Sequence, residues 1–335
     1  MSPALAVDKQ ITKSFPAFAW SVLIYNLAVI AWGALVRATS SGAGCGGHWP
    51  LCNGDVLPSV AQAATRIEFI HRMMSGVALI AVVALPIWAA KVYAKTHPAR
   101  RWAVWSLVFM LTEALLGAAL VLLGYVEKDQ STGRIISLSL HLINTFTLLA
   151  CLALTAWWSN IRPLPYGRGS VCDGHHRMAN PTELQASASG RTPWNLKIAI
   201  AAVVLVSVAG AITALGDTLF PARTLVEGMR ADFSTQANFL VRLRVIHPFL
   251  AVLTGFYVAA LAFPQIKKQK LAAWLLAFVT LQLVAGGVNV MLSVPLTMQL
   301  LHLLIADGLW ITLILFVNQS RFAAPVVLEP AQQTR

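Results

Sequence analysis

Eight long apolar runs, separated by short polar segments, dominate the hydrophobic pattern of this chain. A helix needs about 20 apolar residues to cross the hydrocarbon core of a membrane. Such runs lie at Phe15–Val36, Ile67–Ala94, Trp102–Gly124, Ile136–Trp158, Leu196–Leu215, Leu240–Pro264, Leu271–Leu292 and Met298–Val317. The pattern predicts an all-α integral membrane protein with eight transmembrane helices embedded in a lipid bilayer, and both termini on one side.

The longest polar segment, residues 159–194, is rich in Gly, Ser and Pro. It predicts a cytoplasmic linker between two four-helix bundles, residues 15–158 and 195–318, with a cytoplasmic tail at 319–335. Short motifs recur in the same order in both halves: Gly33-Ala-Leu with Gly210-Ala-Ile, Ile70-His71 with Ile246-His247, and Leu140-His141-Leu142 with Leu301-His302-Leu303. The halves are therefore predicted to be pseudo-symmetric copies with one orientation in the membrane.

Composition and charge agree with a membrane protein. Only 11% of the 335 residues are charged and the formal net charge is +12. The basic residues lie between the apolar runs and not on one face, which favours membrane topology over a nucleic-acid partner. If the N-terminus lies in the cytoplasm, most of the basic residues fall in segments that also lie in the cytoplasm. The residues before Ser14 lack the features of a signal or transit peptide. The chain is therefore predicted in a cell inner (cytoplasmic) membrane with cytoplasmic termini.

Four histidines, His71, His141, His247 and His302, lie near the starts of the even-numbered helices, at a similar depth near the outer face. An ionisable group within a membrane is costly and usually faces inward toward a partner. Two histidines on alternate helices of each bundle suit the two axial ligands of a haem iron. The alternatives are plain interhelical hydrogen bonds and zinc, which lacks a third ligand here.

Haem propionates require cations at the membrane boundary, and arginine suits carboxylates. Candidates at outer helix ends are Arg37, Arg66, Arg72, Arg134, Arg242 and Arg244. A metal site at Cys172, His175 and His176 is not favoured, because a flexible loop fixes no ligand geometry.

The N-terminal half carries features that the other half lacks. Glu68 precedes His71 by three residues, so both project from one face of a helix, where the carboxylate could manage protons. Alternatively, Thr65 and Glu68 form a capping box that only starts the helix. Cys45 and Cys52 lie in the first outer loop, where a disulfide lid is favoured over a free redox-active pair.

Two further acids, Glu113 and Asp307, lie within the apolar runs. Glu113 is either a protonated packing residue or part of a proton route, and Gln282 occupies its place in the second half. Asp307 does not share a helix face with His302 and receives no role.

The residues also resemble a known family. Gly33-Ala-Leu-Val-Arg37 with Ser41-Gly42, Cys45…Trp49-Pro-Leu-Cys52-Asn-Gly54, Ile67-Glu68-Phe-Ile-His71-Arg72 and His141-Leu-Ile-Asn-Thr145 are similar to haem A synthase. The similarity extends to Ile246-His247 and Leu301-His302, so it covers all eight helices. The long inner linker is not explained by it.

The resemblance implies oxidation of the C8 methyl of haem O to a formyl group, giving haem A for terminal oxidases. It implies that His71 and His141 frame the substrate haem, with Glu68 as the catalytic carboxylate. His247 and His302 would bind a haem b cofactor. The implied partners are a haem O synthase and an unidentified membrane electron acceptor. A non-enzymatic di-haem b cytochrome and a haem transporter are the competing hypotheses.

Overall fold

The computed structural model describes residues 3–59, 61–160, 192–222 and 224–322, and all its regular elements are helices. The long helices are α1 (Pro3–Ala38), α2 (Ala63–Val92), α3 (Pro98–Leu122), α4 (Thr132–Ser159), α6 (Trp194–Leu219), α9 (Ile246–Ala262), α10 (Lys270–Met291) and α11 (Leu296–Phe322). Shorter ones are α7 (Leu225–Asp232), α8 (Phe239–Arg242) and the 3₁₀ turns η1 (Leu243–Val245) and η2 (Phe263–Gln265). Most of the predicted linker, including Cys172, His175 and His176, lies outside the described residues, as does most of the predicted tail.

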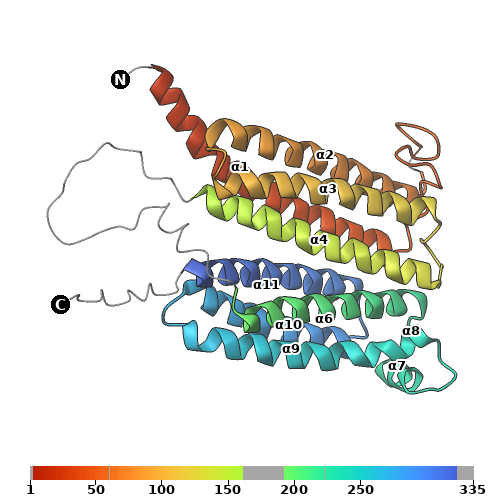
Figure 1. Ribbon diagram of the computed structural model, residues 1–335. Coiled ribbons are helices and arrows are strands. Elements are labelled where there is room, and N and C mark those ends of the chain that lie inside the picture. The colour runs from red at the N-terminus through yellow and green to blue at the C-terminus, as the bar shows by residue number, and fades with distance from the viewer. Residues whose placement is uncertain (1–2, 60, 161–191, 223, 323–335) are drawn as a thin grey trace.

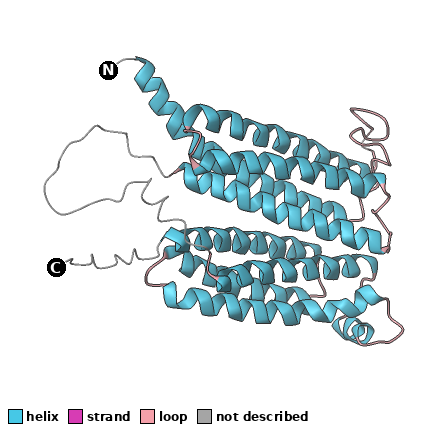
Figure 2. Ribbon diagram, in the orientation of Figure 1, coloured by secondary structure: helices cyan, strands magenta, loops and turns pink. Residues whose placement is uncertain are grey.

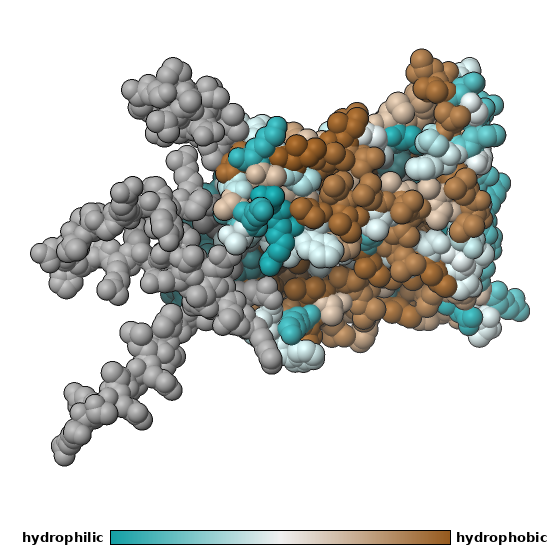
Figure 3. Space-filling model, turned by 45° about the horizontal axis from the view of Figure 1, so that its top comes forward, coloured by the Kyte–Doolittle hydropathy of each residue, from teal (hydrophilic) through white to brown (hydrophobic). Residues whose placement is uncertain are grey.

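Eight helical segments are long and apolar enough to cross a membrane, as the sequence predicted. The eighth predicted run is part of α11, and the sixth is the continuous stretch from α8 through η2, Phe239–Gln265. Figure 3 shows a hydrophobic band across the helices with polar residues gathered beyond one end of it. Large apolar side chains of the spanning helices, such as Ile80, Leu115 and Phe256, are exposed, as expected for helices that face lipid. The chain is a multi-pass membrane protein.

The helices form two groups of four (Figures 1 and 2). In the first group α1, α2, α3 and α4 pack as a ring in chain order, and in the second α6, α9, α10 and α11 do the same. The groups meet along α1 and α4 on one side and α6 and α11 on the other. The loop between α1 and α2 and helix α7 lie at one end of the molecule, opposite the start of α1 and the end of α11. The short helix α7 was not predicted, because its eight residues carry no long apolar run.

Specific contacts join the two groups at their interface. Trp310 of α11 stacks on Phe146 of α4, with ring centroids 4.9 Å apart, and its indole N–H donates to the Phe146 carbonyl at 2.7 Å. Arg37, at the end of α1, crosses to the second group. Its guanidinium donates to Ala214 O at 2.8 Å, Thr218 Oγ1 at 3.0 Å and Gln299 Oε1 at 3.3 Å. Because an arginine at the membrane boundary is costly to bury without partners, this contact should stabilise the paired bundles.

We expect Arg37→Ala to lower the free energy of unfolding by about 2 kcal/mol, because charge-assisted hydrogen bonds contribute that much and the substitution leaves their acceptors unpaired. Thermal denaturation of purified protein in detergent measures the effect. The matched control is Arg230→Ala, since Arg230 is exposed in α7 and should leave the midpoint unchanged. Equal midpoints for both variants would show that Arg37 does not hold the bundles together.

Candidate functional site: four histidines and a disulfide loop

Each of the four histidines faces a glycine on the preceding long helix of its group. A β-carbon placed on Gly33 of α1 would lie 3.0 Å from Cε1 of His71, and one on Gly210 of α6 would lie 2.8 Å from Cε1 of His247. The corresponding distances are 3.8 Å from Gly117 to His141 and 3.2 Å from Gly286 to His302. The absence of a side chain at these four positions leaves room for an imidazole between the helices.

The histidines form two pairs, one in each group of helices. In the second group the ring centroids of His247 and His302 are 6.5 Å apart and their planes are nearly perpendicular, at 88°. A metal–imidazole bond is about 2 Å long, so two imidazoles on opposite sides of one iron hold their centroids roughly 6 Å apart. In the first group His71 and His141 are close enough to interact electrostatically. The separation and angle of the second pair therefore suit one central metal ion.

The nitrogens of these rings are consistent with ligation by haem. His247 Nδ1 lies 3.1 Å from Val206 O, which leaves Nε2 for a metal, as is usual for a histidine ligand. The Nδ1 atoms of His71, His141 and His302 are buried without a hydrogen-bond partner among the described residues. In the same part of the chain no three His, Cys, Asp or Glu side chains gather as a metal site. Pairs of histidines fit a porphyrin, which supplies four further nitrogens itself.

One departure from this pattern involves His302. Its Nε2 lies 3.1 Å from Nε2 of Gln282 on α10. Ligation through Nε2 therefore requires this contact to be given up.

We expect Gly210→Ala to lower haem content, because its β-carbon would meet the His247 ring at 2.8 Å and force the imidazole to move. The matched control is Gly117→Ala, whose β-carbon meets His141 at an ordinary contact distance of 3.8 Å. Haem per protein, from the absorbance of the pyridine adduct, measures both. A normal haem content in Gly210→Ala would show that the close approach of this glycine is not needed.

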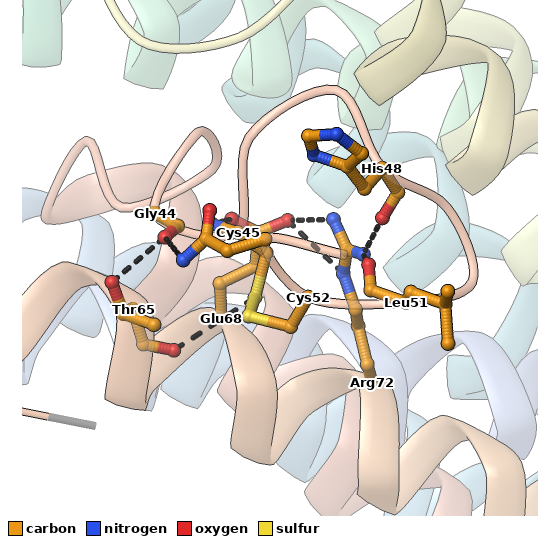
Figure 4. Close-up of a disulfide and its surroundings, with 9 residues drawn as sticks. Gly44, Cys45, His48, Leu51, Cys52, Thr65, Glu68 and Arg72 are labelled. Carbon is orange, nitrogen blue, oxygen red and sulfur yellow. Dashed lines mark hydrogen bonds and ion pairs between the residues drawn. A yellow bond between two sulfur atoms is a disulfide. The ribbon is translucent and has the colours of Figure 1, made fainter. Parts of the chain in front are cut away.

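Cys45 and Cys52 form a disulfide, as predicted, within the loop that connects α1 and α2 (Figure 4). The loop packs directly on the first turns of α2. A β-carbon on Gly44 would lie 2.4 Å from the backbone carbon of Ala64, so only glycine fits there. Thr65 Oγ1 donates to Gly44 O at 2.7 Å. The loop therefore has a defined position on the helix that carries His71.

Glu68 is buried beneath this loop, and its carboxylate is fully engaged (Figure 4). Its Oε2 accepts the backbone N–H of Cys45 at 2.8 Å, and its Oε1 pairs with Arg72 at 2.5 Å. Arg72 in turn donates to the carbonyls of His48 and Leu51, at 2.6 and 2.5 Å. Glu68 and Arg72 thus join α2 to both sides of the disulfide loop.

The capping-box alternative for Glu68 is wrong. Helix α2 begins at Ala63 with Gln62 as its N-cap residue, and Gln62 makes no side-chain cap. Thr65 and Glu68 are already inside the helix, and both side chains contact the loop instead of the free backbone donors of the first turn. Sequence reasoning placed the start of this helix too late, since Ala63 and Ala64 extend it beyond the apolar run.

The candidate arginines differ in their partners. Arg72 and Arg37 have the contacts given above, and Arg134 donates to the carbonyls of Glu127 and Asp129, both at 2.7 Å. Arg244 pairs with Asp217 at 3.0 Å and with Asp232 at 3.8 Å. Partial burial raises the pKa of Asp232, and Arg244 opposes that shift. Arg66 and Arg242 are exposed, and each precedes a histidine, His71 or His247, by five residues.

A polar cluster around His141 was not predicted. Glu113 of α3 accepts hydrogen bonds from Asn144 Nδ2, at 2.6 Å, and from Thr145 Oγ1, and its Oε1 lies 3.5 Å from His141 Nδ1. The signal that could have found it is spacing. Glu113 and Gln282 each precede by four residues the glycine that faces a histidine.

Asp307, which received no role, is fully buried in α11, and neither carboxylate oxygen has a hydrogen-bond partner among the described residues.

Comparison with known families agrees with these features. Residues 16–314 match the family model described as cytochrome oxidase assembly protein. The chain belongs to this family. Its similarity to a heme A synthase of Bacillus cereus is 29% identity over 327 residues, covering 94% of this chain and 98% of the relative. A heme A synthase of Bacillus licheniformis is 45% identical over 101 residues, 30% of this chain and 33% of the relative.

A different name belongs to another relative. A protoheme IX farnesyltransferase of Thermus thermophilus is 41% identical over 309 residues, which cover 90% of this chain but 48% of the relative. The chain thus spans about half the length of this relative, whereas it matches nearly all of the Bacillus cereus protein.

Proposed function

We propose that this protein is a haem A synthase, an oxidoreductase that converts the C8 methyl of haem O to a formyl group. The observation that carries the proposal is the repeated pair of half-buried histidines, each facing a glycine, in a chain of the cytochrome oxidase assembly family. His71 and His141 would hold the substrate haem O in the first bundle. His247 and His302 would hold a haem b in the second bundle.

Conversion of a methyl to a formyl group removes four electrons and four protons and adds one water oxygen. His71 and His141 would hold the porphyrin iron, which when bound would supply the redox chemistry of this conversion. Glu68 lies one turn from His71 on α2 and is buried, so its carboxylate is placed to accept protons or to stabilise positive charge at the methyl carbon. The disulfide loop above it limits the access of water, and Arg72 holds the carboxylate in place.

The second pair of histidines gives electrons a route out of the first bundle. The two bundles are in direct contact along α4 and α11, which carry His141 and His302. A haem b between His247 and His302 would pass electrons to a membrane acceptor of unidentified nature. The exposed Arg66 and Arg242, at matching positions before His71 and His247, are the best-placed arginines for haem propionates.

The similarity to a protoheme IX farnesyltransferase supports a haem O synthase as a partner of this protein. About half of that protein lies outside its match to this chain, while the heme A synthase of Bacillus cereus is matched almost completely. Farnesylation of protohaem produces haem O, the substrate proposed here. We therefore infer that a haem O synthase supplies this protein with its substrate. We also propose that the protein lies in a bacterial cytoplasmic membrane. Both termini would then be in the cytoplasm and the haem sites near the outer face.

Co-expression with a haem O-producing enzyme, followed by haem extraction and chromatography, tests the function. The synthase yields haem A, identified by its formyl group. A di-haem b cytochrome, the second candidate, would bind protohaem and leave haem O unchanged. A transporter would move haem O without altering it. Recovery of haem O alone from cells with a functional electron-transport chain would therefore overturn the proposal.

A further inference from the structure

We propose that Glu113 is a positioning residue that accepts the Nδ1–H of His141 and thereby lowers the reduction potential of the iron bound in the first bundle. This inference rests on the proposed function, because it requires His141 to bind haem. Glu113 approaches the imidazole from α3, on the side of Gly117, and not from the α2 face that carries Glu68.

Hydrogen-bond donors surround the carboxylate of Glu113. Asn144 Nδ2 donates to Oε2. The hydroxyl of Thr145 contacts Oε1 and also lies 2.8 Å from the His141 carbonyl oxygen, and its single proton is shared between these two acceptors. Thr112 donates to Oδ1 of Asn144 at 2.6 Å, which fixes the Asn144 amide with its NH₂ group toward Glu113. Donors from neighbouring side chains favour a carboxylate that acts only as an acceptor. The group is thereby ready to accept a further hydrogen bond.

The remaining donor in reach is the His141 imidazole. Its Nδ1 is buried, makes no hydrogen bond within the described chain, and lies 3.5 Å from Oε1 of Glu113. This separation is longer than a formed hydrogen bond, and a shift of about half an ångström would close it. A proton on Nδ1 leaves Nε2 unprotonated and available to iron. Carboxylates that accept this proton make an imidazole a stronger electron donor, which favours the oxidised metal.

The other histidines show that Glu113 is specific to one site. In each case the relevant position lies four residues before the glycine that faces the ring. At His247 this position is Val206, whose backbone carbonyl contacts Nδ1 at 3.1 Å. At His302 it is Gln282, a neutral amide that contacts Nε2 and not Nδ1. Only His141 faces an acid at this position. Among these four positions, the one acid therefore lies in the first bundle, where the substrate would be oxidised.

The experiment compares the unmodified protein with Glu113→Gln and Glu113→Asp. Full-length protein in detergent is loaded with ferric protohaem, and its reduction is followed spectroscopically against applied potential. For Glu113→Gln we expect the reduction potential of one of the two haem components to rise. At a fixed applied potential, the ratio of reduced to oxidised haem should increase about tenfold, which corresponds to about 59 mV for one electron.

The outcomes separate the two proposals. Two bound haem groups with unchanged potentials in Glu113→Gln would overturn the role of Glu113 and leave the proposed function intact. A purely structural role of Glu113 would lower the haem content without moving the potential of the haem that remains, which also contradicts this inference. If the unmodified protein bound no haem at His71 and His141, the proposed function itself would fail. Restoration of the original potential in Glu113→Asp would support a carboxylate acceptor.

Discussion

Replacing His247 and His302 together by alanine should remove one of the two haem groups and abolish haem A formation. The two rings stand at the separation and angle that a shared iron permits, and no other histidine of the described second bundle lies beside them. Loss of both axial ligands removes the bonds that hold the iron. Haem bound per protein, measured after purification in the presence of protohaem, should fall to about half of the original value.

The control for this experiment is His48→Ala. His48 is exposed in the disulfide loop, and only its backbone carbonyl is used, by Arg72. Haem content should therefore be unaffected. A double variant of His247 and His302 that retained both haem groups would refute the pairing on which the whole site depends. The corresponding double variant of His71 and His141 should keep the second haem and bind no haem O.

Glu68→Gln should retain haem and reduce haem A yield by about 100-fold or more, since general acid–base catalysis contributes on the order of 10² to 10⁴. Glutamine can still accept the Cys45 N–H through its carbonyl oxygen, so this contact between the loop and the side chain is kept. What is lost is the negative charge and the capacity to take up a proton. Extracted haem, resolved into haem O, haem A and any hydroxylated intermediate, measures the effect.

The ion pair of Glu68 with Arg72 makes a second variant necessary, because Glu68 could act only by holding the disulfide loop. Arg72→Gln breaks the ion pair and the contacts with the carbonyls of His48 and Leu51, yet it leaves the carboxylate in place. A catalytic Glu68 predicts a much smaller loss in Arg72→Gln than in Glu68→Gln. Equal losses would assign Glu68 to the loop alone.

Much of this architecture could be predicted from the sequence, because a membrane imposes simple rules on helix length and polarity. All eight spans were predicted from apolar runs, and the structure mainly extends their ends, as at Ala63. The disulfide was predicted from two cysteines in one short loop. The histidines were found because an ionisable side chain within an apolar run is rare. The pseudo-two-fold relation of the halves and the sidedness of the membrane stay predictions.

Side-chain partners across helices were much harder to predict. Arg37 was a candidate for a propionate, but its guanidinium contacts Ala214, Thr218 and Gln299 of the other bundle. Glu113 was recognised only as a buried acid, and its contact with His141 depends on the rotation of α3 against α4.

The sequence by itself thus determined the membrane-spanning helices and the residue types able to bind haem, since hydropathy and ligand chemistry are local properties of the chain. The tertiary structure decided which side chains meet. It paired each histidine with a glycine, enclosed Glu68 beneath the disulfide loop, and placed Glu113 beside one imidazole. These contacts depend on how neighbouring helices rotate and pack. Helix packing is set by many weak contacts between side chains of different helices, so no single segment of the sequence determines it.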